Sequence, residues 1–182
     1  MTDRQKLKQI ILEKSYEKRK VVLSSGAESD FYFDGKQTTL HPEGAYLTGR
    51  LFFEALNDIE DIDGVGGLTL GADPIATALS VVSFLNGRPI PAFIIRKEPK
   101  GHGTGAWLEG RKNLPEGARV VIVEDVVTSG GSSLKAIRRA EEEGMRVLGV
   151  VTLVDREEGG RENIEQAGYW MKAVFTKSDI LS

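Results

Sequence analysis

The chain of 182 residues contains no cysteine and only two histidines, His41 and His102. Disulfides, thiolate nucleophiles and cysteine-ligated metal sites are therefore excluded, and a zinc site built from histidines is not expected. No apolar run reaches the roughly 18 residues that a membrane-spanning helix needs, and the charged N-terminal stretch lacks the features of a secretory signal. We therefore expect a cytoplasmic protein with no membrane partner.

Basic residues are scarcer than acidic ones: 24 lysines and arginines against 27 aspartates and glutamates give a net charge of −3. A nucleic-acid-binding protein would carry the opposite balance, so we expect no nucleic-acid partner. The one clearly positive stretch runs from Arg96 to Lys112 and holds five basic and two acidic residues. A local positive segment on an acidic chain suits a small anion, although a solvated charged loop would have the same composition.

Glycine, in contrast, is abundant, with 21 residues. It clusters at 64–71, 101–110, 130–131 and 159–160. Glycine is needed where the backbone turns sharply or lies against a ligand, so these clusters are candidate ligand-binding turns. The fractions of hydrophobic (40%) and charged (28%) residues are ordinary for a globular protein, and the length fits a single domain over residues 1–182.

Strand-like and helix-like segments alternate through most of the chain. Strands are expected at 64–70, 90–95, 120–123, 147–154 and 169–175, helices at 73–85, 131–143 and 160–167, and a long loop at 96–116. Ahead of these, helices are expected at 3–18 and 42–57 and short strands at 21–23 and 31–33. This alternation predicts an α/β fold in which helices cover both faces of a mostly parallel sheet. Ligands of such sheets lie at the carboxyl ends of the strands.

The most specific motif follows the expected strand at 120–123. There Glu124 and Asp125 lead into Thr128-Ser-Gly-Gly-Ser132 and a helix. A turn of small residues at a helix N-terminus offers backbone N–H groups to a phosphate, and carboxylates beside it can accept from the hydroxyls of a ribose. It is not the GxxxxGK[ST] nucleotide loop, because no lysine follows the glycines. The alternative is a plain strand–turn–helix in which threonine and serine act as N-caps.

This run resembles the phosphoribosyl diphosphate (PRPP) binding motif of the type I phosphoribosyltransferases. Four further stretches, at 23–35, 66–74, 96–103 and 154–160, resemble in the same order the members of that family that act on orotate. The resemblance implies the type I fold, a central, mostly parallel sheet with helices on both faces. It also implies a small N-terminal hood over residues 1–40 on the substrate side and a PRPP-binding core over 60–175.

The activity implied by the resemblance is magnesium-dependent transfer of ribose 5-phosphate from PRPP to orotate, in pyrimidine biosynthesis. The products are orotidine 5′-monophosphate and pyrophosphate. The resemblance further implies a homodimer in which the 96–112 loop is shared between subunits. We expect Mg²⁺ to be held mainly by PRPP and water, and assign it no protein ligand. Transfer to a purine base, or a nucleotide-sensing regulator of the same fold, remain alternatives.

The resemblance assigns PRPP binding to the loop and the turn. The residues are Arg96, Lys97, Lys100, His102, Glu124, Asp125, Val126, Val127, Thr128, Ser129, Gly130, Gly131 and Ser132. Among them Lys100, His102 and Asp125 are expected to be catalytic. The chemistry suits cations on the loop, because negative charge develops on the pyrophosphate as its bond to the ribose breaks.

Orotate binding is assigned by the resemblance to Thr128, Arg156, Tyr32 and Phe33. Arginine suits the carboxylate of orotate because it can donate two parallel hydrogen bonds. An ion pair with Asp155 or Glu157 would also account for Arg156, and a core strand would account for the two aromatic residues.

The chain departs from some relatives in two places. They carry a lysine where Ser24 stands and a tyrosine–lysine pair near Leu70-Gly71, and this chain has neither. We therefore expect backbone amides at Gly71 and Ala72 to serve the pyrophosphate instead.

Overall fold

A central sheet carries the site. The computed structural model describes residues 1–22, 28–99 and 106–182. The sheet consists of β3 (Gly64–Leu68), β4 (Ala92–Ile95), β5 (Leu108–Glu109), β6 (Arg119–Val127), β7 (Arg146–Asp155) and β8 (Trp170–Thr176). Its order is β5-β4-β3-β6-β7-β8, and only the β4–β5 pair is antiparallel. The expected α/β fold with a mostly parallel sheet is confirmed.

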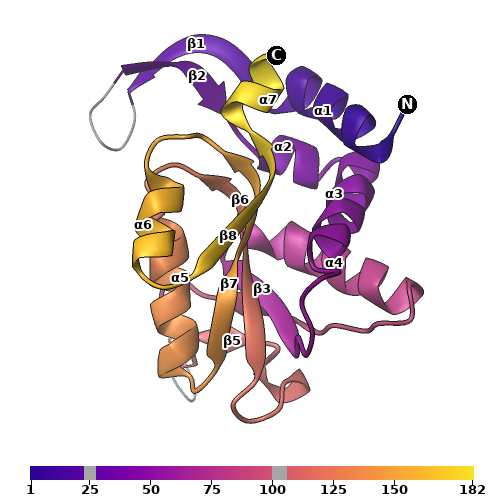
Figure 1. Cartoon of the computed structure of the whole chain (residues 1–182), viewed down its shortest axis with the longest axis vertical. Helices are drawn as coiled ribbons and strands as arrows, with labels where there is room; N and C mark the ends of the chain where they lie inside the picture. Colours follow the sequence, from indigo (N-terminus) through magenta and orange to yellow (C-terminus); the bar gives the residue numbers. More distant parts are fainter. Residues whose placement is uncertain (23–27, 100–105) are drawn as a thin grey trace.

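Helices cover both faces of this sheet. On one face lie α3 (Pro42–Ala55) and α4 (Ala72–Leu85), and on the other lie α5 (Gly131–Glu142) and α6 (Gly160–Gln166) (Figure 1). Strand β6 contributes to the cores on both faces. Val121 and Val123 join the cluster under α3 and α4, whereas Val120 and Ile122 join the cluster under α5. A strand that is buried on both sides has no polar face, which explains its continuous apolar sequence.

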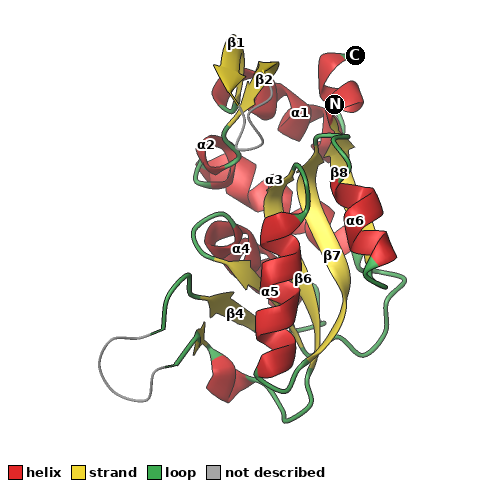
Figure 2. Cartoon of the chain, turned by 90° about the vertical axis from the view of Figure 1, so that its left-hand side faces the viewer, coloured by secondary structure: helices red, strands yellow, loops and turns green. Residues whose placement is uncertain are grey.

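The N-terminal segment lies over the carboxyl ends of the sheet strands, together with the last helix (Figure 2). It comprises α1 (Asp3–Lys14), the antiparallel hairpin of β1 (Tyr16–Val22) and β2 (Glu28–Phe33), and α2 (Lys36–Thr39); the last helix is α7 (Lys177–Leu181). Leu7 and Ile11 of α1 are fully buried in the main core. The segment is thereby fixed over the edge of the sheet where ligands bind in this class of fold.

Strand β6 is longer than the sequence predicts. It continues past Val123 to Val127, because Glu124, Val126 and Val127 pair with Thr152, Val154 and Asp155 of β7. The two acidic residues at 124–125 therefore lie within the last part of the strand rather than after it.

Two other segments also differ from the expectation. Helix α1 ends at Lys14 rather than at residue 18, and Tyr16 begins strand β1. The ring centroid of Tyr16 lies 5.1 Å from that of Phe31 in β2. The expected loop 96–116 contains β5 and a 3-10 turn at Arg111–Asn113. Within the described ranges, every helix is too short or too polar to cross a bilayer.

Candidate active site

The turn between β6 and α5 forms a small hollow. Residues 126–133 line a cavity of about 190 Å³. Gly130 has a φ of 79°, which favours glycine, and a Cβ there would lie 2.9 Å from the carbonyl oxygen of Gly160. In the described part of the chain no side chain caps the N-terminus of α5, so its serines and threonine do not act as N-caps. The helix N-terminus and its N–H groups are therefore available to an anion such as phosphate.

Neighbouring segments hold this turn in place. The amide of Asn163 in α6 donates to the carbonyl of Ser129 at 2.9 Å. The backbone N–H of Arg156, just after β7, donates to the carbonyl of Val127 at 2.9 Å. The hollow is thus fixed from two sides before any ligand binds, which favours tight binding.

Asp125 lies beneath backbone from two other segments. Its side chain is buried, and its Oδ1 accepts from the N–H of Val126 at 3.0 Å. A Cβ at Gly71 would lie 2.5 Å from Asp125 Oδ1, and a Cβ at Gly35 would lie 2.8 Å from Asp125 Cβ. Side chains at these two positions would displace the carboxylate, so both glycines are needed for it to occupy this place.

Glu124 is the more deeply buried of the two acids. Its Oε2 has no hydrogen-bond partner among the described residues. Burial raises the pKa of Glu124 well above its usual range, and the nearby charge of Asp125 raises it further. An unsatisfied acceptor at this depth is suited to a ligand hydroxyl that donates to it.

We expect Glu124→Gln to stabilise the fold at neutral pH. Because the pKa is raised in the native state, folded wild type binds more protons than the unfolded chain above about pH 4, and its stability falls as the pH rises. Glutamine does not titrate and escapes this loss. Urea unfolding should show a higher free energy of unfolding for the variant than for wild type near neutrality, and the difference should shrink toward acid. The exposed Glu116→Gln serves as the control, and a gap that does not depend on pH would contradict the assignment.

Arg156 lies at the end of β7 and is 6% exposed. Its Nη2 donates to the carbonyl of Phe31 at 3.1 Å, and its Nε donates to Glu158 Oε1 at 3.2 Å. Among the described residues, the acid that pairs with Arg156 is Glu158, at 3.1 Å, and not Asp155 or Glu157, the alternative considered from the sequence. Arg156 therefore links the hood to the end of the sheet, beside the strand that bears the two acids.

The two predicted aromatic residues face opposite sides of β2. Phe33 belongs to the core and stacks on Phe31 with ring centroids 6.0 Å apart. Tyr32 is half-buried, and the guanidinium of Arg19 lies 3.9 Å above its ring. Of this pair, Tyr32 is the one whose ring is not part of the core.

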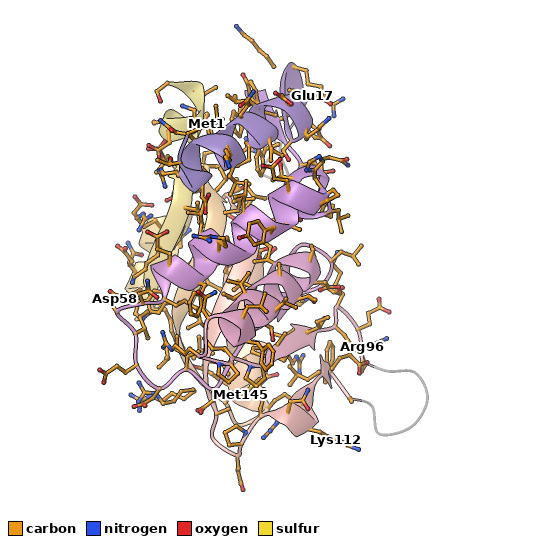
Figure 3. All side chains as sticks on the ribbon, turned by 90° about the vertical axis from the view of Figure 1, so that its right-hand side faces the viewer. Met1, Glu17, Asp58, Arg96, Lys112 and Met145 are labelled. Atoms are coloured by element: carbon orange, nitrogen blue, oxygen red, sulfur yellow. The ribbon has the colours of Figure 1, made fainter. Side chains whose placement is uncertain are left out.

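The positive segment is described only at its ends. Arg96 forms an ion pair with Glu109 at 3.0 Å, and Lys97 is exposed. Figure 3 shows Arg96 and Lys112 on the same edge of the molecule. Lys100 and His102 lie outside the described residues, so their predicted roles stay predictions.

Lys36 also lies close to Asp125, which the sequence does not predict. Its Nζ lies 2.8 Å from Asp34 Oδ1 and 4.0 Å from Asp125 Oδ2. A single lysine in a short polar segment gives no pattern, and its proximity to Asp125 exists only once the hood folds over β6.

The comparisons with known proteins agree with this geometry. The family model described as "Phosphoribosyl transferase domain" matches residues 44–171. The chain is 52% identical to the orotate phosphoribosyltransferase of Nostoc sp., over 98% of this chain and 85% of that one. It is 47% identical to that of Aquifex aeolicus, over 100% and 99% of the two chains.

Solved structures give the same result. The crystal structure of the Mycobacterium tuberculosis H37Rv orotate phosphoribosyltransferase in complex with PRPP has a TM-score of 0.82 at 39% identity and full coverage of both chains. The match to an adenine phosphoribosyl transferase from Trypanosoma brucei has a TM-score of 0.69 and covers 100% of this chain and 82% of that one. At 13% identity, it shows a similarity of fold alone. The chain therefore belongs to the phosphoribosyl transferase domain family and, within it, to the orotate phosphoribosyltransferases.

Proposed function

We propose that the protein transfers the ribose 5-phosphate group of PRPP to orotate, giving orotidine 5′-monophosphate and pyrophosphate in pyrimidine biosynthesis. The observation that carries the proposal is the hollow at 126–133 next to two buried acids, in a chain of this family. The 5′-phosphate is bound by backbone N–H groups of Thr128–Ser132 and by the N-terminus of α5. Ribose hydroxyls donate to Glu124 and Asp125.

The base lies on the β7 side of the ribose. Arg156 binds the carboxylate of orotate, Thr128 contacts the ring from the turn, and Tyr32 covers it from the hood. Support comes from the hydrogen bond that joins Arg156 N–H to the carbonyl of Val127, which keeps the arginine next to the turn. Phe33 acts through the core by fixing β2.

Mg²⁺ fits this site as an ion carried by the substrate. No three carboxylate or imidazole groups gather in residues 1–22, 28–99 and 106–182. Two adjacent acids next to a diphosphate suit an ion that is coordinated by phosphate oxygens and water. When bound, Mg²⁺ supplies positive charge to the pyrophosphate leaving group.

We expect chelation by EDTA to abolish turnover and excess Mg²⁺ to restore it.

We further propose a cytoplasmic homodimer in which the 96–112 loop of one subunit reaches the site of the other. In this arrangement Lys100 and His102, with Arg96 and Lys97, stabilise the charge that develops on pyrophosphate. Closure of a loop over the site would also exclude water from it.

The proposed function is tested by mixing the protein with PRPP, Mg²⁺ and either orotate or a panel of purine bases. We expect the ultraviolet absorbance of orotate to fall only when PRPP and Mg²⁺ are both present. Consumption of a purine base and not of orotate would show that the protein is a purine-base phosphoribosyltransferase. Tight binding of RNA without turnover of any base would favour a nucleotide-sensing regulator of the same fold.

A further inference from the structure

Lys36 is held in a defined position at the start of α2. Its Nζ is 2.8 Å from Asp34 Oδ1. Asp34 in turn accepts from the backbone N–H of Lys36 and from the side chain of Gln37, both at 3.2 Å. An acceptor that is fixed by three donors fixes its lysine as well, so the ammonium group is directed toward Asp125 rather than moving freely in solvent.

The ammonium group keeps capacity for a ligand. It has three N–H donors, and Asp34 occupies one of them. Asp125 Oδ2, at 4.0 Å, is too far for a full hydrogen bond, and the described residues offer no third acceptor. The hydrogen bond to Asp34 raises the pKa of Lys36 despite partial burial, and the charge of Asp125 adds to this. The group is therefore a cation at neutral pH.

Lys36 lies on the side of Asp125 that is formed by the β3–α4 turn. It shares a hollow of about 590 Å³ with Leu70 of that turn and with Asp73 in the first turn of α4. Gly71, between them, has its backbone against the carboxylate of Asp125. The cation and the N-terminus of α4 thus border the same space and favour an anion there, next to a largely apolar lining and Asp73, whose Oδ2 accepts from the hydroxyl of Thr69 at 2.7 Å.

One PRPP molecule can connect the surroundings of Lys36 to the hollow at 126–133. PRPP carries its 5′-phosphate and its diphosphate at opposite sides of the ribose. With the 5′-phosphate in the hollow at 126–133 and the ribose at Asp125, the diphosphate extends toward Gly71 and Lys36. We propose that Lys36 binds the diphosphate end of PRPP and is a further substrate-binding residue of the reaction. The inference rests on the proposed function for the identity of the substrate.

The test compares Lys36→Met with Lys36→Arg, which keeps the charge. Lys172→Met is the matched control, because Lys172 also pairs with a carboxylate, Asp58, at 2.5 Å, but lies in the early part of β8. Titration calorimetry with Mg²⁺ measures the Kd of PRPP, of pyrophosphate and of ribose 5-phosphate for each protein. We expect Lys36→Met to raise the Kd of PRPP and of pyrophosphate by about 10- to 100-fold. The Kd of ribose 5-phosphate should stay as in wild type.

Two outcomes would overturn the inference. Unchanged binding of pyrophosphate and PRPP in Lys36→Met would show that the cation does not reach them. An equal loss of ribose 5-phosphate binding would mean that Lys36 acts only by positioning Asp125. Lys36→Gln is the second neutral variant in case the methionine variant does not fold, and Lys36→Arg should recover most of the affinity.

Failure of the proposed function would be visible separately. If wild type binds PRPP and pyrophosphate but uses a base other than orotate, the function changes and the Lys36 comparison still stands. If wild type turns over orotate and Lys36→Met binds pyrophosphate normally, only the inference about Lys36 fails.

Discussion

Asp125→Asn is expected to lower kcat/KM for PRPP by about 100- to 1000-fold. In the proposed function, the carboxylate accepts from a ribose hydroxyl and places negative charge near the ribose as positive charge develops on it. Asparagine keeps the shape but loses the charge, and Gly35 and Gly71 leave no room for the side chain to move. Steady-state kinetics with each substrate varied should show that PRPP use is impaired far more than the binding of orotate.

The control for this variant is Asp63→Asn. Asp63 also accepts a backbone N–H of β6, that of Arg119 at 2.8 Å, but at the opposite end of the strand. A general effect of losing an acid that supports β6 would appear in both variants. PRPP affinity and turnover that remain unchanged in Asp125→Asn would remove its role at the ribose.

Lys100→Ala is expected to lower kcat by about 100- to 1000-fold without loss of thermal stability. The reason is that a cation on the loop acts mainly on charge that develops in the transition state, so binding of the ground-state substrates is affected less. Turnover is measured per folded molecule, next to the melting temperature. A lower melting temperature with normal turnover would make the lysine structural.

The same variant tests the sharing of sites between subunits. Lys100→Ala and Asp125→Asn are mixed, unfolded and refolded together, so that about half of the dimers are mixed. Each mixed dimer then has one site with both defects and one with neither, and about a quarter of wild-type activity should return. If a confirmed dimer shows no recovery, Lys100 serves its own subunit.

The elements with a strong hydrophobic pattern could be predicted from the sequence. Strand β6 and helix α5 were placed correctly because an apolar run followed by an amphipathic stretch is a local signal. The predicted end of β6, at residue 123, was wrong because Glu124 and Asp125 interrupt that apolar run. Only pairing with β7, a long-range interaction, keeps them in the strand. The two-residue strand β5 likewise exists only through its pairing with β4.

The candidate site was predictable in part for the same reason. The residues that form the hollow at 126–133 are consecutive, so their chemistry can be read from the sequence. The surroundings of Asp125 come from three distant segments, and no local pattern brings Lys36 or Gly71 to it. No pattern in the sequence singles out Glu158 as an acid that pairs with Arg156, and the predicted role of Arg156 in binding orotate stays a prediction.

The paired ends of β6 and β7 have a consequence for how base preference can change. Val127 and Asp155 are register partners, so the phosphate turn and Arg156 leave the sheet at the same level but on separate strands. In the proposed function, the end of β7 and the hood face the base together with Thr128, whereas the rest of the turn after β6 binds the phosphate. Substitutions at the end of β7 and in the hood are therefore expected to change base preference while the turn after β6 still binds the sugar phosphate.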